Sequence, residues 1–476
     1  MTHVDPTAIS NRGSSPGGGE SATRIGPLNL DRQGLPDQAA IDAIYAERDF
    51  QRACQCYLWG LPLVAYGQWQ NQHETVFGAK DGDIVKYVSV RDKLGLITAN
   101  ATTPYVMGFV NTSHTGPLVV EVPPGEVAGG FGDFWERSIT DFGLTGPDRG
   151  KGGRYLLLGP GQEPPKGVTY DFEVRSPTVN VFHAFRILTT DPAEGDRILH
   201  GYQVYPASAK NPPKTRILTP DGRPWSGTQP TGMAYWERLN EYLQIEPVRE
   251  EDRLFMAMLK PLGIEKGKPF QPDAAQTRAL TDGAEIGQLM AIANSFDKRF
   301  ETARYGGQWD RAVNVAMSQE SEFYSQLDER SSWFYEAVGL SEGMTTQTPG
   351  EGQVYLSSYR DAQKQWFDGG KTYRLHVPSD VPAGQWWSVA LYDVETRCFM
   401  DTKYDKVEIG SRTDLARNAD GSVDLVFAPE PPTDSPESNW VPTVPGRAWF
   451  TYFRLYAPLK PYFDASWKLP DIEVVK

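Results

Sequence analysis

Residues 97–111, with the sequence ITANATTPYVMGFVN, open a strand-like run with side chains that could hold a small molecule. Asn100 supplies an amide, Thr103 a hydroxyl and Tyr105 a phenol, and an apolar stretch follows them. A mostly apolar cavity with a few converging polar groups is the general form of a small-molecule site. The same groups could instead satisfy the backbone at a buried strand end. The sequence predicts a pocket here, and the strand-end interpretation is the alternative.

A second segment, TVNVFHAFRI, combines a histidine with an arginine. With the two-residue period of a strand, His183 shares an apolar face with Val181 and Phe185, whereas Arg186 lies on the opposite face. His183 could move protons, or it could be a hydrogen-bonded core residue. Arg186 presents a planar fork of donors that suits a carboxylate or a carbonyl, and a structural ion pair is the alternative.

Two C-terminal segments repeat the combination of arginine with aromatic rings. In AWFTYFRLYAP, Arg454 and Tyr456 fall on one face, together with two further rings. Arg454 could anchor an anion, or it could be a cation–π element of the core. In QWWSVALYD, Trp387 suits a flat apolar ligand or a sugar, and a place in a sandwich core is equally ordinary for it.

Other chemistry has weaker support in the sequence. FGDFWERSITDFG contains Asp133, Glu136 and Asp141, which could do acid–base work if they meet, but the sequence gives no distance between them. There is no Walker loop, no dinucleotide-binding glycine pattern and no Gly-x-Ser-x-Gly motif. The six histidines and three cysteines show no metal-ligand spacing. We therefore predict a site without metal and without cofactor.

Composition restricts the partners and the location. The chain of 476 residues has a net charge of −14, which argues against a nucleic-acid partner. No apolar run is long enough to span a membrane. The start of the chain lacks the basic and apolar parts of a secretory signal. We therefore expect a cytoplasmic protein without a membrane partner, or a periplasmic or secreted one if a signal was removed beforehand.

Periodicity predicts a mainly β protein with a helical part. The pattern is helical before Gly60, where Pro62 should end the helix, and short strands with Gly- and Pro-rich turns follow. A helical stretch then separates two β blocks, which suit sandwiches or jelly rolls. No convincing internal repeat is visible, although two β modules could still be structural relatives. The predicted parts are a disordered tail (1–36), a helix with the first β-sandwich module (37–230), a helical segment (231–345) and a second β-sandwich module (346–476).

Several ordered motifs resemble a known pair of bacterial domains. The C-terminal motifs are YRLHVP, WWSVALYD, DGSVDLVFAPEPP, NWVP and FRLYAP. They are similar to domain of unknown function twelve-fourteen. The N-terminal motifs TTPYVMGFVN, GPLVVEVPPG, GRYLLLGPG and SPTVNVFHAFRI resemble its usual companion, domain of unknown function twelve-fifty-four. The resemblance implies β-sandwich-like modules with a helical part and implies little chemistry. Many members of the family are exported, and the missing signal departs from that.

These observations lead to one hypothesis with two alternatives. The hypothesis is an enzyme that acts on a small organic molecule by cofactor-free hydrolysis or related acid–base chemistry. Tyr105 and His183 would move protons, Arg186 and Arg454 would hold a polar group, and Trp387 would pack the substrate. The first alternative is a binding or carrier protein that leaves the ligand unchanged in the same pocket. The second is an assembly protein that forms a homo-oligomer.

Overall fold

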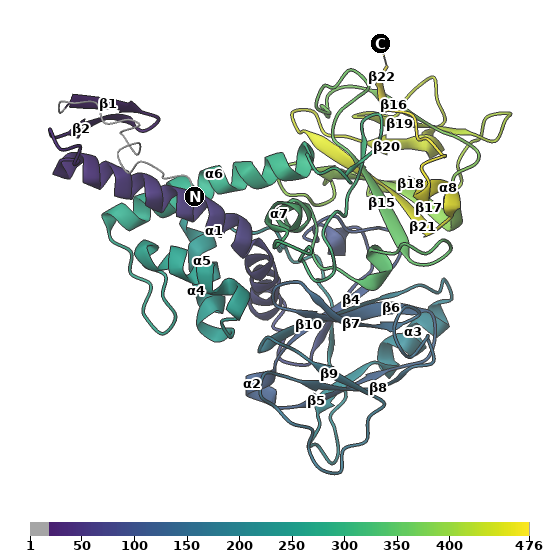
Figure 1. The fold of residues 1–476 in the computed structure, drawn as a ribbon. Coiled ribbons are helices and arrows are strands. Elements are labelled where there is room, and N and C mark those ends of the chain that lie inside the picture. Colours follow the sequence, from purple (N-terminus) through teal and green to yellow (C-terminus); the bar gives the residue numbers. More distant parts are fainter. Residues whose placement is uncertain (1–18, 476) are drawn as a thin grey trace, which may run out of the picture.

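Two β-sandwich modules and a group of helices make up the chain (Figure 1). The computed structural model describes residues 19–475. In the view of Figure 1 the second module lies above the first, and the helices flank the junction between them. The prediction of an α+β protein with two sandwich modules and a helical part is confirmed.

The first module packs a six-stranded sheet against a four-stranded sheet. The six-stranded sheet consists, in spatial order, of β12 (Ile217–Leu218), β3 (Ile84–Tyr87), β4 (Tyr105–Asn111), β10 (Asn180–Ile187), β6 (Val127–Asp133) and β7 (Ser138–Gly143). The four-stranded sheet consists of β11 (Gln203–Pro206), β5 (Leu118–Val122), β8 (Gly153–Leu158) and β9 (Phe172–Arg175). Two short helices belong to this module, α2 (Thr112–Thr115) and α3 (Pro192–Gly201). Val106, Val120 and Phe185 belong to the apolar cluster that fills the space between the sheets.

The second module has the same two-layer construction. Its six-stranded sheet consists of β13 (Arg304–Gly306), β14 (Trp309–Arg311), β15 (Gln353–Ser358), β21 (Trp449–Pro458), β17 (Ala383–Asp393) and β18 (Glu408–Gly410). Its four-stranded sheet consists of β20 (Trp440–Pro442), β19 (Val423–Ala428), β16 (Tyr373–Val377) and β22 (Glu473–Val474), and helix α8 (Lys460–Phe463) follows β21. β13 and β14 fall inside the predicted helical segment, yet they extend the sheet of this module.

The two modules share one topology along the chain. The run β4 to β11 of the first module corresponds, strand for strand, to the run β15 to β22 of the second. One sheet has the order β4-β10-β6-β7 in the first module and β15-β21-β17-β18 in the second. The other sheet has the order β11-β5-β8-β9 and β22-β16-β19-β20, respectively. Even the parallel pair of the four-stranded sheet is in the same place, β8 with β9 and β19 with β20. The β modules are therefore structural relatives, although their sequences show no convincing repeat.

The helices pack between and beside the modules. They are α1 (Gln38–Thr75), α4 (Met233–Ile245), α5 (Arg253–Leu259), α6 (Ala274–Phe296) and α7 (Leu327–Glu336). The expected end of α1 near Gly60 is wrong, because the helix continues through Pro62 to Thr75. Proline inside a helix costs about 3 kcal/mol. Residues 56–67 are nevertheless buried throughout, so their packing against the other helices and the first module outweighs that cost.

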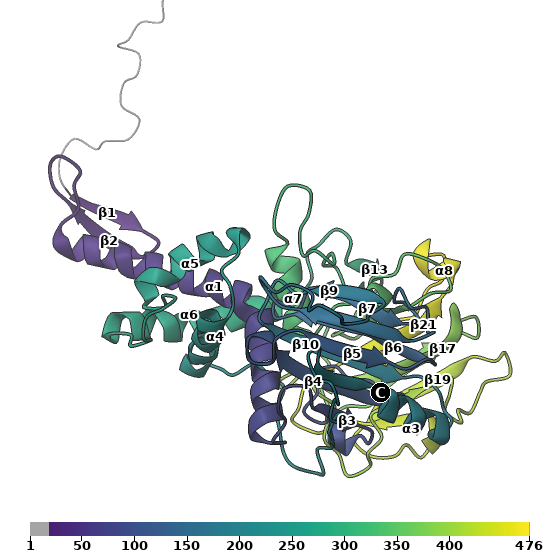
Figure 2. The ribbon, with the colours of Figure 1, turned by 90° about the horizontal axis from the view of Figure 1, so that it is seen from below.

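The described part of the predicted tail is a hairpin. β1 (Gly19–Thr23) and β2 (Gly26–Leu30) pair antiparallel beside the outer end of α1, which projects from the rest of the chain (Figure 2). Residues 1–18, the remainder of that prediction before the hairpin, lie outside the described residues. Among residues 19–475, no helix combines the length and the apolar character needed to cross a membrane.

Both six-stranded sheets pack against other parts of the protein on both of their faces. One face of each sheet covers the interior of its own sandwich. The opposite faces contribute to a third apolar cluster that also contains side chains of α1 and α7. β21 is buried along its whole length, which explains why WFTYFRLYAP reads as a nearly continuous apolar run. Where the two sheets face each other, their side chains leave a space.

Candidate functional site

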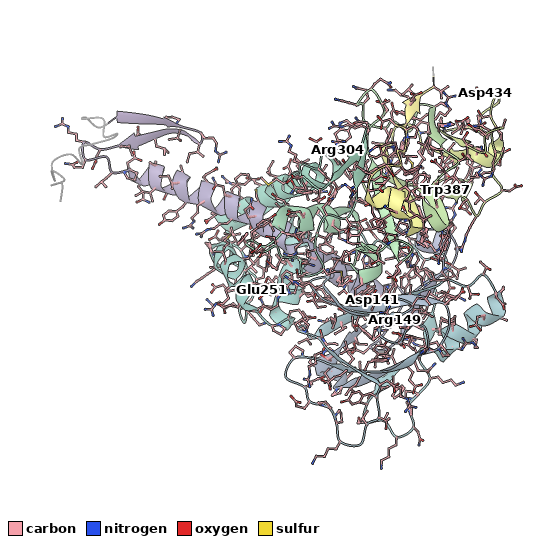
Figure 3. All side chains as sticks on the ribbon, turned by 45° about the vertical axis from the view of Figure 1, so that its right-hand side comes forward. Asp141, Arg149, Glu251, Arg304, Trp387 and Asp434 are labelled. Carbon is pink, nitrogen blue, oxygen red and sulfur yellow. The ribbon has the colours of Figure 1, made fainter. Side chains whose placement is uncertain are left out.

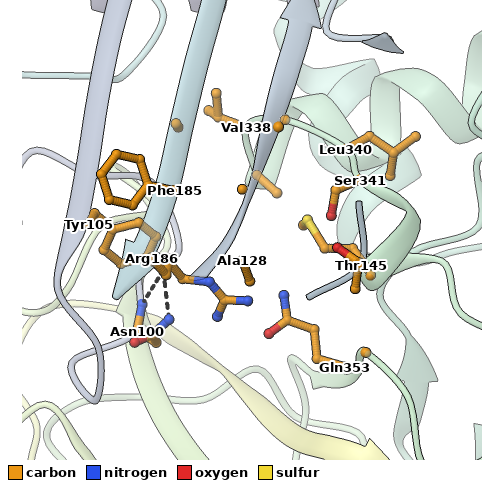
Figure 4. A pocket seen from close by; sticks show the side chains of 18 of the residues that line it. Asn100, Tyr105, Ala128, Thr145, Phe185, Arg186, Val338, Leu340, Ser341 and Gln353 are labelled. Carbon is orange, nitrogen blue, oxygen red and sulfur yellow. Dashed lines mark hydrogen bonds between the residues drawn. The ribbon is translucent and has the colours of Figure 1, made fainter. Parts of the chain in front are cut away.

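A cavity of about 270 Å³ lies between the two modules. Strands β4, β10, β6 and β7 form its wall on the first module, and β15, β17 and β21 form its wall on the second. The segment after α7, residues 337–344, contributes a third wall. Figure 4 shows side chains from these walls pointing into the common space.

Small residues on two strands leave room for the cavity. In β6, with the sequence VAGGFGD, the side chains of Val127 and Phe131 enter the sandwich interior. The alternate residues Ala128, Gly130 and Gly132 therefore face the cavity. Ala184 of β10 pairs with Gly130 and continues the same floor. A glycine-rich strand in an otherwise apolar sheet is a sequence feature that marks this site. The predicted pocket rests instead on residues 97–111.

Arg186 is the free cation of the cavity wall. It stands near the end of β10, directly across from Tyr105 on β4, and is half-buried. Within residues 19–475 its guanidinium makes neither a hydrogen bond nor an ion pair. In Figure 4 this guanidinium lies between the Asn100 side of the cavity and the amide of Gln353. A cation so placed is available to a ligand.

Arg454 occupies the facing wall and is held by the protein. Its Nη2 donates to the carbonyl oxygens of Thr98 at 2.7 Å and Ala99 at 3.2 Å. Three tyrosine rings surround its guanidinium, with ring centroids 5.5–5.6 Å away: Tyr355, Tyr392 and Tyr452. No carboxylate of the described residues pairs with it, and Nη1 has no hydrogen-bond partner. The side chain of Arg454 is only 3% exposed, and the buried carboxylate of Glu408 acts on it electrostatically without forming an ion pair.

Further buried polar atoms of the wall have no hydrogen-bond partner within the described part of the chain. They are the hydroxyls of Tyr452 and Tyr456, Oε1 of Gln353 and Nε1 of Trp386. Burial raises the pKa of both tyrosines, so their hydroxyls stay protonated and can donate. Trp386 stacks on Tyr456 with 4.0 Å between ring centroids. Because buried polar atoms in native proteins are normally paired, this group points to a ligand or water at the same place.

The polar residues that precede β4 bond mainly to one another. The hydroxyl of Tyr105 accepts hydrogen bonds from the backbone N of Asn100 at 3.1 Å and from its Nδ2 at 2.8 Å. Oδ1 of Asn100 accepts from the backbone N of Thr103 at 2.9 Å and from its hydroxyl at 3.0 Å. Asn100 and Tyr105 line the cavity, whereas buried Thr103 does not. The pocket interpretation therefore describes Asn100 and Tyr105, and the strand-end interpretation describes Thr103.

Two residues predicted for the site lie elsewhere. His183 faces the sandwich interior of the first module, where Nδ1 is 3.0 Å from the hydroxyl of Tyr202. Burial lowers the pKa of His183 to about 3, so the ring is neutral. Trp387 packs inside the second module with 5.3 Å between its centroid and that of Phe453. Its neighbour Trp386, on the opposite face of β17, lines the cavity in its place. The catalytic roles predicted for Tyr105 and His183 stay predictions.

Buried carboxylates of the first module hold the third wall. Asp141, marked in Figure 3 where the first module faces the second, accepts from the hydroxyl of Thr145 at 2.8 Å and from the backbone N of Gly343 at 3.4 Å. Glu136 accepts from the backbone N of Gly339. Burial raises the pKa of both carboxyl groups. Asp141 also lines the cavity and is the one carboxylate among its described lining residues.

No metal site accompanies these groups in the described chain. Among residues 19–475, no three His, Cys, Asp or Glu side chains lie together so that they could hold a metal ion. Cys54, Cys56 and Cys398 are buried free thiols, and burial raises the pKa of each.

Two family models match the chain. Residues 85–206 match the model described as protein of unknown function (DUF1254), and residues 352–460 match protein of unknown function (DUF1214). The chain pairs these two domains. The predicted resemblance is therefore confirmed, and β4 with β10 falls in one domain and β15 with β21 in the other. A search of curated proteins finds no match.

Solved structures that are similar to this chain include two bacterial proteins. The VPA0106 protein from Vibrio parahaemolyticus is 17% identical and aligns over 90% of this chain and 100% of its own, with a TM-score of 0.56. An uncharacterised protein from Burkholderia cenocepacia is 13% identical, with 92% and 97% covered and a TM-score of 0.41. The likeness to the Vibrio protein concerns the fold alone.

Proposed function

We propose that this protein binds a small organic anion in the cavity between its two modules. The single observation that carries the proposal is Arg186, whose guanidinium faces the cavity without a partner among the described residues. Guanidinium groups in proteins normally pair with carboxylates or phosphates, because their planar fork of donors matches those anions. A bound anion would supply the missing partner.

The surroundings of Arg186 support an anion over a cation or a neutral sugar. Arg454 adds a second positive charge from the facing wall without a carboxylate paired to it. The phenols of Tyr355 and Tyr456 are neutral hydrogen-bond donors because burial raises their pKa. Asp141, the carboxylate of the wall, is occupied by Thr145 and by the backbone of the 339–343 segment.

The cavity volume restricts the size of the ligand. The cavity measures about 270 Å³. This lies at the low end of pockets for small organic ligands, which hold about 300 Å³ or more. A molecule of about ten non-hydrogen atoms fits, whereas a nucleotide or an oligosaccharide does not.

Calorimetric titration with acetate, propanoate and inorganic phosphate at constant ionic strength tests the proposal. We expect saturable binding of at least one of these probes with one site per chain. Arg186→Leu should weaken that binding about 10- to 150-fold, since a hydrogen bond to a charged group contributes about 1.5–3 kcal/mol. Arg186→Lys keeps the charge but not the fork, so an intermediate affinity is expected.

Arg154→Leu provides a matched control. Arg154 is an exposed arginine of β8 in the same module, paired with Glu121 at 3.1 Å. Its removal changes the net charge as Arg186→Leu does and should leave the affinity unchanged. Absence of saturable binding by all three probes, or equal weakening by Arg186→Leu and Arg154→Leu, contradicts the proposal.

Hydrolysis by acid–base chemistry is the second candidate function. The observation that favours it is Asp141, a buried carboxyl group in the cavity wall with a raised pKa. Tyr105 lines the same cavity, whereas His183 does not. Phenyl acetate incubated with the protein and followed by mass spectrometry tests this function. Asp141→Asn should reduce the rate at least about 100-fold; an equal rate in the variant would show that Asp141 is not the catalytic acid or base.

A further inference from the structure

The cavity has a polar end and an apolar end. Paired residues on β4, β10 and β6 form three successive rows, and all of their members except Phe109 line the cavity. The rows are Tyr105–Arg186–Ala128, Met107–Ala184–Gly130 and Phe109–Phe182–Gly132. The rows are two residues apart, so Arg186 and Phe182 are separated by about 13 Å along the strand. Along β10 and β6 the first row carries a positive charge, the second row has small residues and the third row has an aromatic ring.

Aromatic side chains of β10 and α1 close the apolar end, and Trp333 of α7 lies against Tyr355 with 6.1 Å between ring centroids. Phe182 of β10 packs against Tyr66 of α1, with 4.7 Å between ring centroids, and against Trp69 at 6.3 Å. Trp333 of α7 lines the same cavity. The indole nitrogens of both tryptophans are already bonded, Trp69 to the carbonyl of Gly227 and Trp333 to that of Gly339. These two rings therefore offer mainly apolar surface to a ligand.

On β10 and β6 the middle of the floor has almost no side chains, whereas Met107 of β4 borders it. Ala184 and Gly130 pair across β10 and β6, and both are half-buried, which leaves part of the peptide surface open to the cavity. A flat ring can lie on such a surface and reach the aromatic end. Rings prefer offset stacked or edge-to-face contacts with other rings, which Phe182 and Tyr66 are placed to provide.

From this gradient we infer that the ligand is an aromatic carboxylate. Its carboxylate pairs with Arg186, and its ring lies over Ala184 and Gly130 toward Phe182. This inference rests on the proposed anion site and adds the chemical class of the body attached to the anion. A dicarboxylate or a sugar acid of the same length would place polar groups against Phe182 and Trp69, where their hydration would be lost without replacement.

Calorimetry with two carboxylates tests the inference. Propanoate and 3-phenylpropanoate share the same anionic end, and only the latter carries a ring. We expect 3-phenylpropanoate to bind the full chain at least tenfold more tightly than propanoate. Ala184→Leu extends a side chain over the floor and should reduce this ratio to about one. Ala193→Leu, on the exposed side of α3, is the control and should leave the ratio unchanged.

The outcomes separate this inference from the proposed function. Equal affinity of both carboxylates, each weakened by Arg186→Leu, overturns the aromatic class and keeps the anion site. An unchanged ratio in Ala184→Leu, in a variant with the circular dichroism spectrum of the parent, overturns the placement of the ring over the floor. Binding of neither carboxylate overturns this inference, and absence of acetate and phosphate binding as well overturns the anion site.

Discussion

The two β modules carry the same pair of residues in different surroundings. Arg186 of β10 lies across from Tyr105 of β4, and Arg454 of β21 lies across from Tyr355 of β15. Because β10 and β21, and β4 and β15, are equivalent strands of one topology, the pairs occupy corresponding places. The local sequences FRI and FRL around the arginines are also alike.

The two arginines differ in whether the protein itself already binds their side chains. Arg454 is fixed by the carbonyls of Thr98 and Ala99, which belong to the other module, and so it ties the modules together. Arg186 has no such partner among the described residues and faces the open space. In two modules of one topology, one arginine is thus a structural link, and the other has no direct partner among residues 19–475.

The helices also hold the two modules differently. Glu246, which follows α4, accepts hydrogen bonds from the backbone of Val179 and Asn180 at the start of β10 and from Nδ2 of Asn180. Glu336, at the end of α7, accepts from Nζ of Lys298 at 3.0 Å and from the hydroxyl of Tyr359, which follows β15 of the second module, at 2.6 Å. The side chains of Lys298 and Glu336 are both 0% exposed. The first link uses neutral donors, and the second uses a buried ion pair.

Breaking the ion pair should have the largest effect. Lys298→Met leaves Glu336 buried without its cation, which costs about 3–5 kcal/mol of the free energy of unfolding. Asn180→Ala removes one neutral donor from Glu246 and should cost about 1–3 kcal/mol. Urea unfolding followed by circular dichroism measures both. The double variant Lys298→Met with Glu336→Gln should recover much of the loss, and no recovery would show that the charge is not the cause.

Removing each arginine should separate their roles. Arg454→Met deletes a charged donor with two carbonyl partners and should lower the free energy of unfolding by about 1.5–3 kcal/mol. Arg186→Met removes a side chain without partners and should change it by less than about 0.5 kcal/mol. Urea unfolding followed by circular dichroism measures the free energy of unfolding of both variants. Equal losses in the two variants would mean that Arg186 is as structural as Arg454.

The modules should also differ in their response to acid. His183 lies three residues before Arg186, whereas the equivalent position on β21 is Thr451, which does not titrate. Burial lowers the pKa of His183 from its ordinary 6.5 to about 3. Between pH 6.5 and pH 3 the histidine therefore binds a proton in the unfolded chain but not in the folded chain. This contribution lowers stability as pH falls, by about 1.4 kcal/mol per pH unit.

Urea unfolding of His183→Gln between pH 6 and pH 4 measures this contribution. The pH dependence of its stability should be about 1.4 kcal/mol per unit less steep in the acid-destabilising direction than that of the parent. Val181→Ala, on the same buried face of β10, is the control and should shift the curve down in parallel. Equal slopes for the parent and His183→Gln would mean that the histidine is protonated in the folded chain.

Most of the residues predicted for the site line the cavity: Asn100, Tyr105, Arg186, Arg454 and Tyr456. For the four on strands, alternation assigns each side chain to a face. Alternation does not say which face of a strand buried on both sides meets a ligand. The sequence therefore predicts Trp387 for the site, whereas its neighbour Trp386 lines the cavity.

The cavity itself depends on contacts that no local pattern contains. It exists because the free faces of two sheets, more than 160 positions apart in the sequence, meet without filling the space over Gly130 and Ala184. The placement of His183 in a sandwich interior likewise depends on which sheet covers its face. The shared topology of the modules was hidden because only short segments such as FRI and FRL remain similar.

The most direct test of the anion site is a crystal structure of the protein with 3-(4-bromophenyl)propanoate, located by the anomalous signal of bromine. The predicted result is a carboxylate within hydrogen-bonding distance of the Arg186 guanidinium, with the bromine beside Phe182 between the two modules. Ordered ligand elsewhere on the protein, or an inverted ligand with its carboxylate among the aromatic rings, would contradict the site.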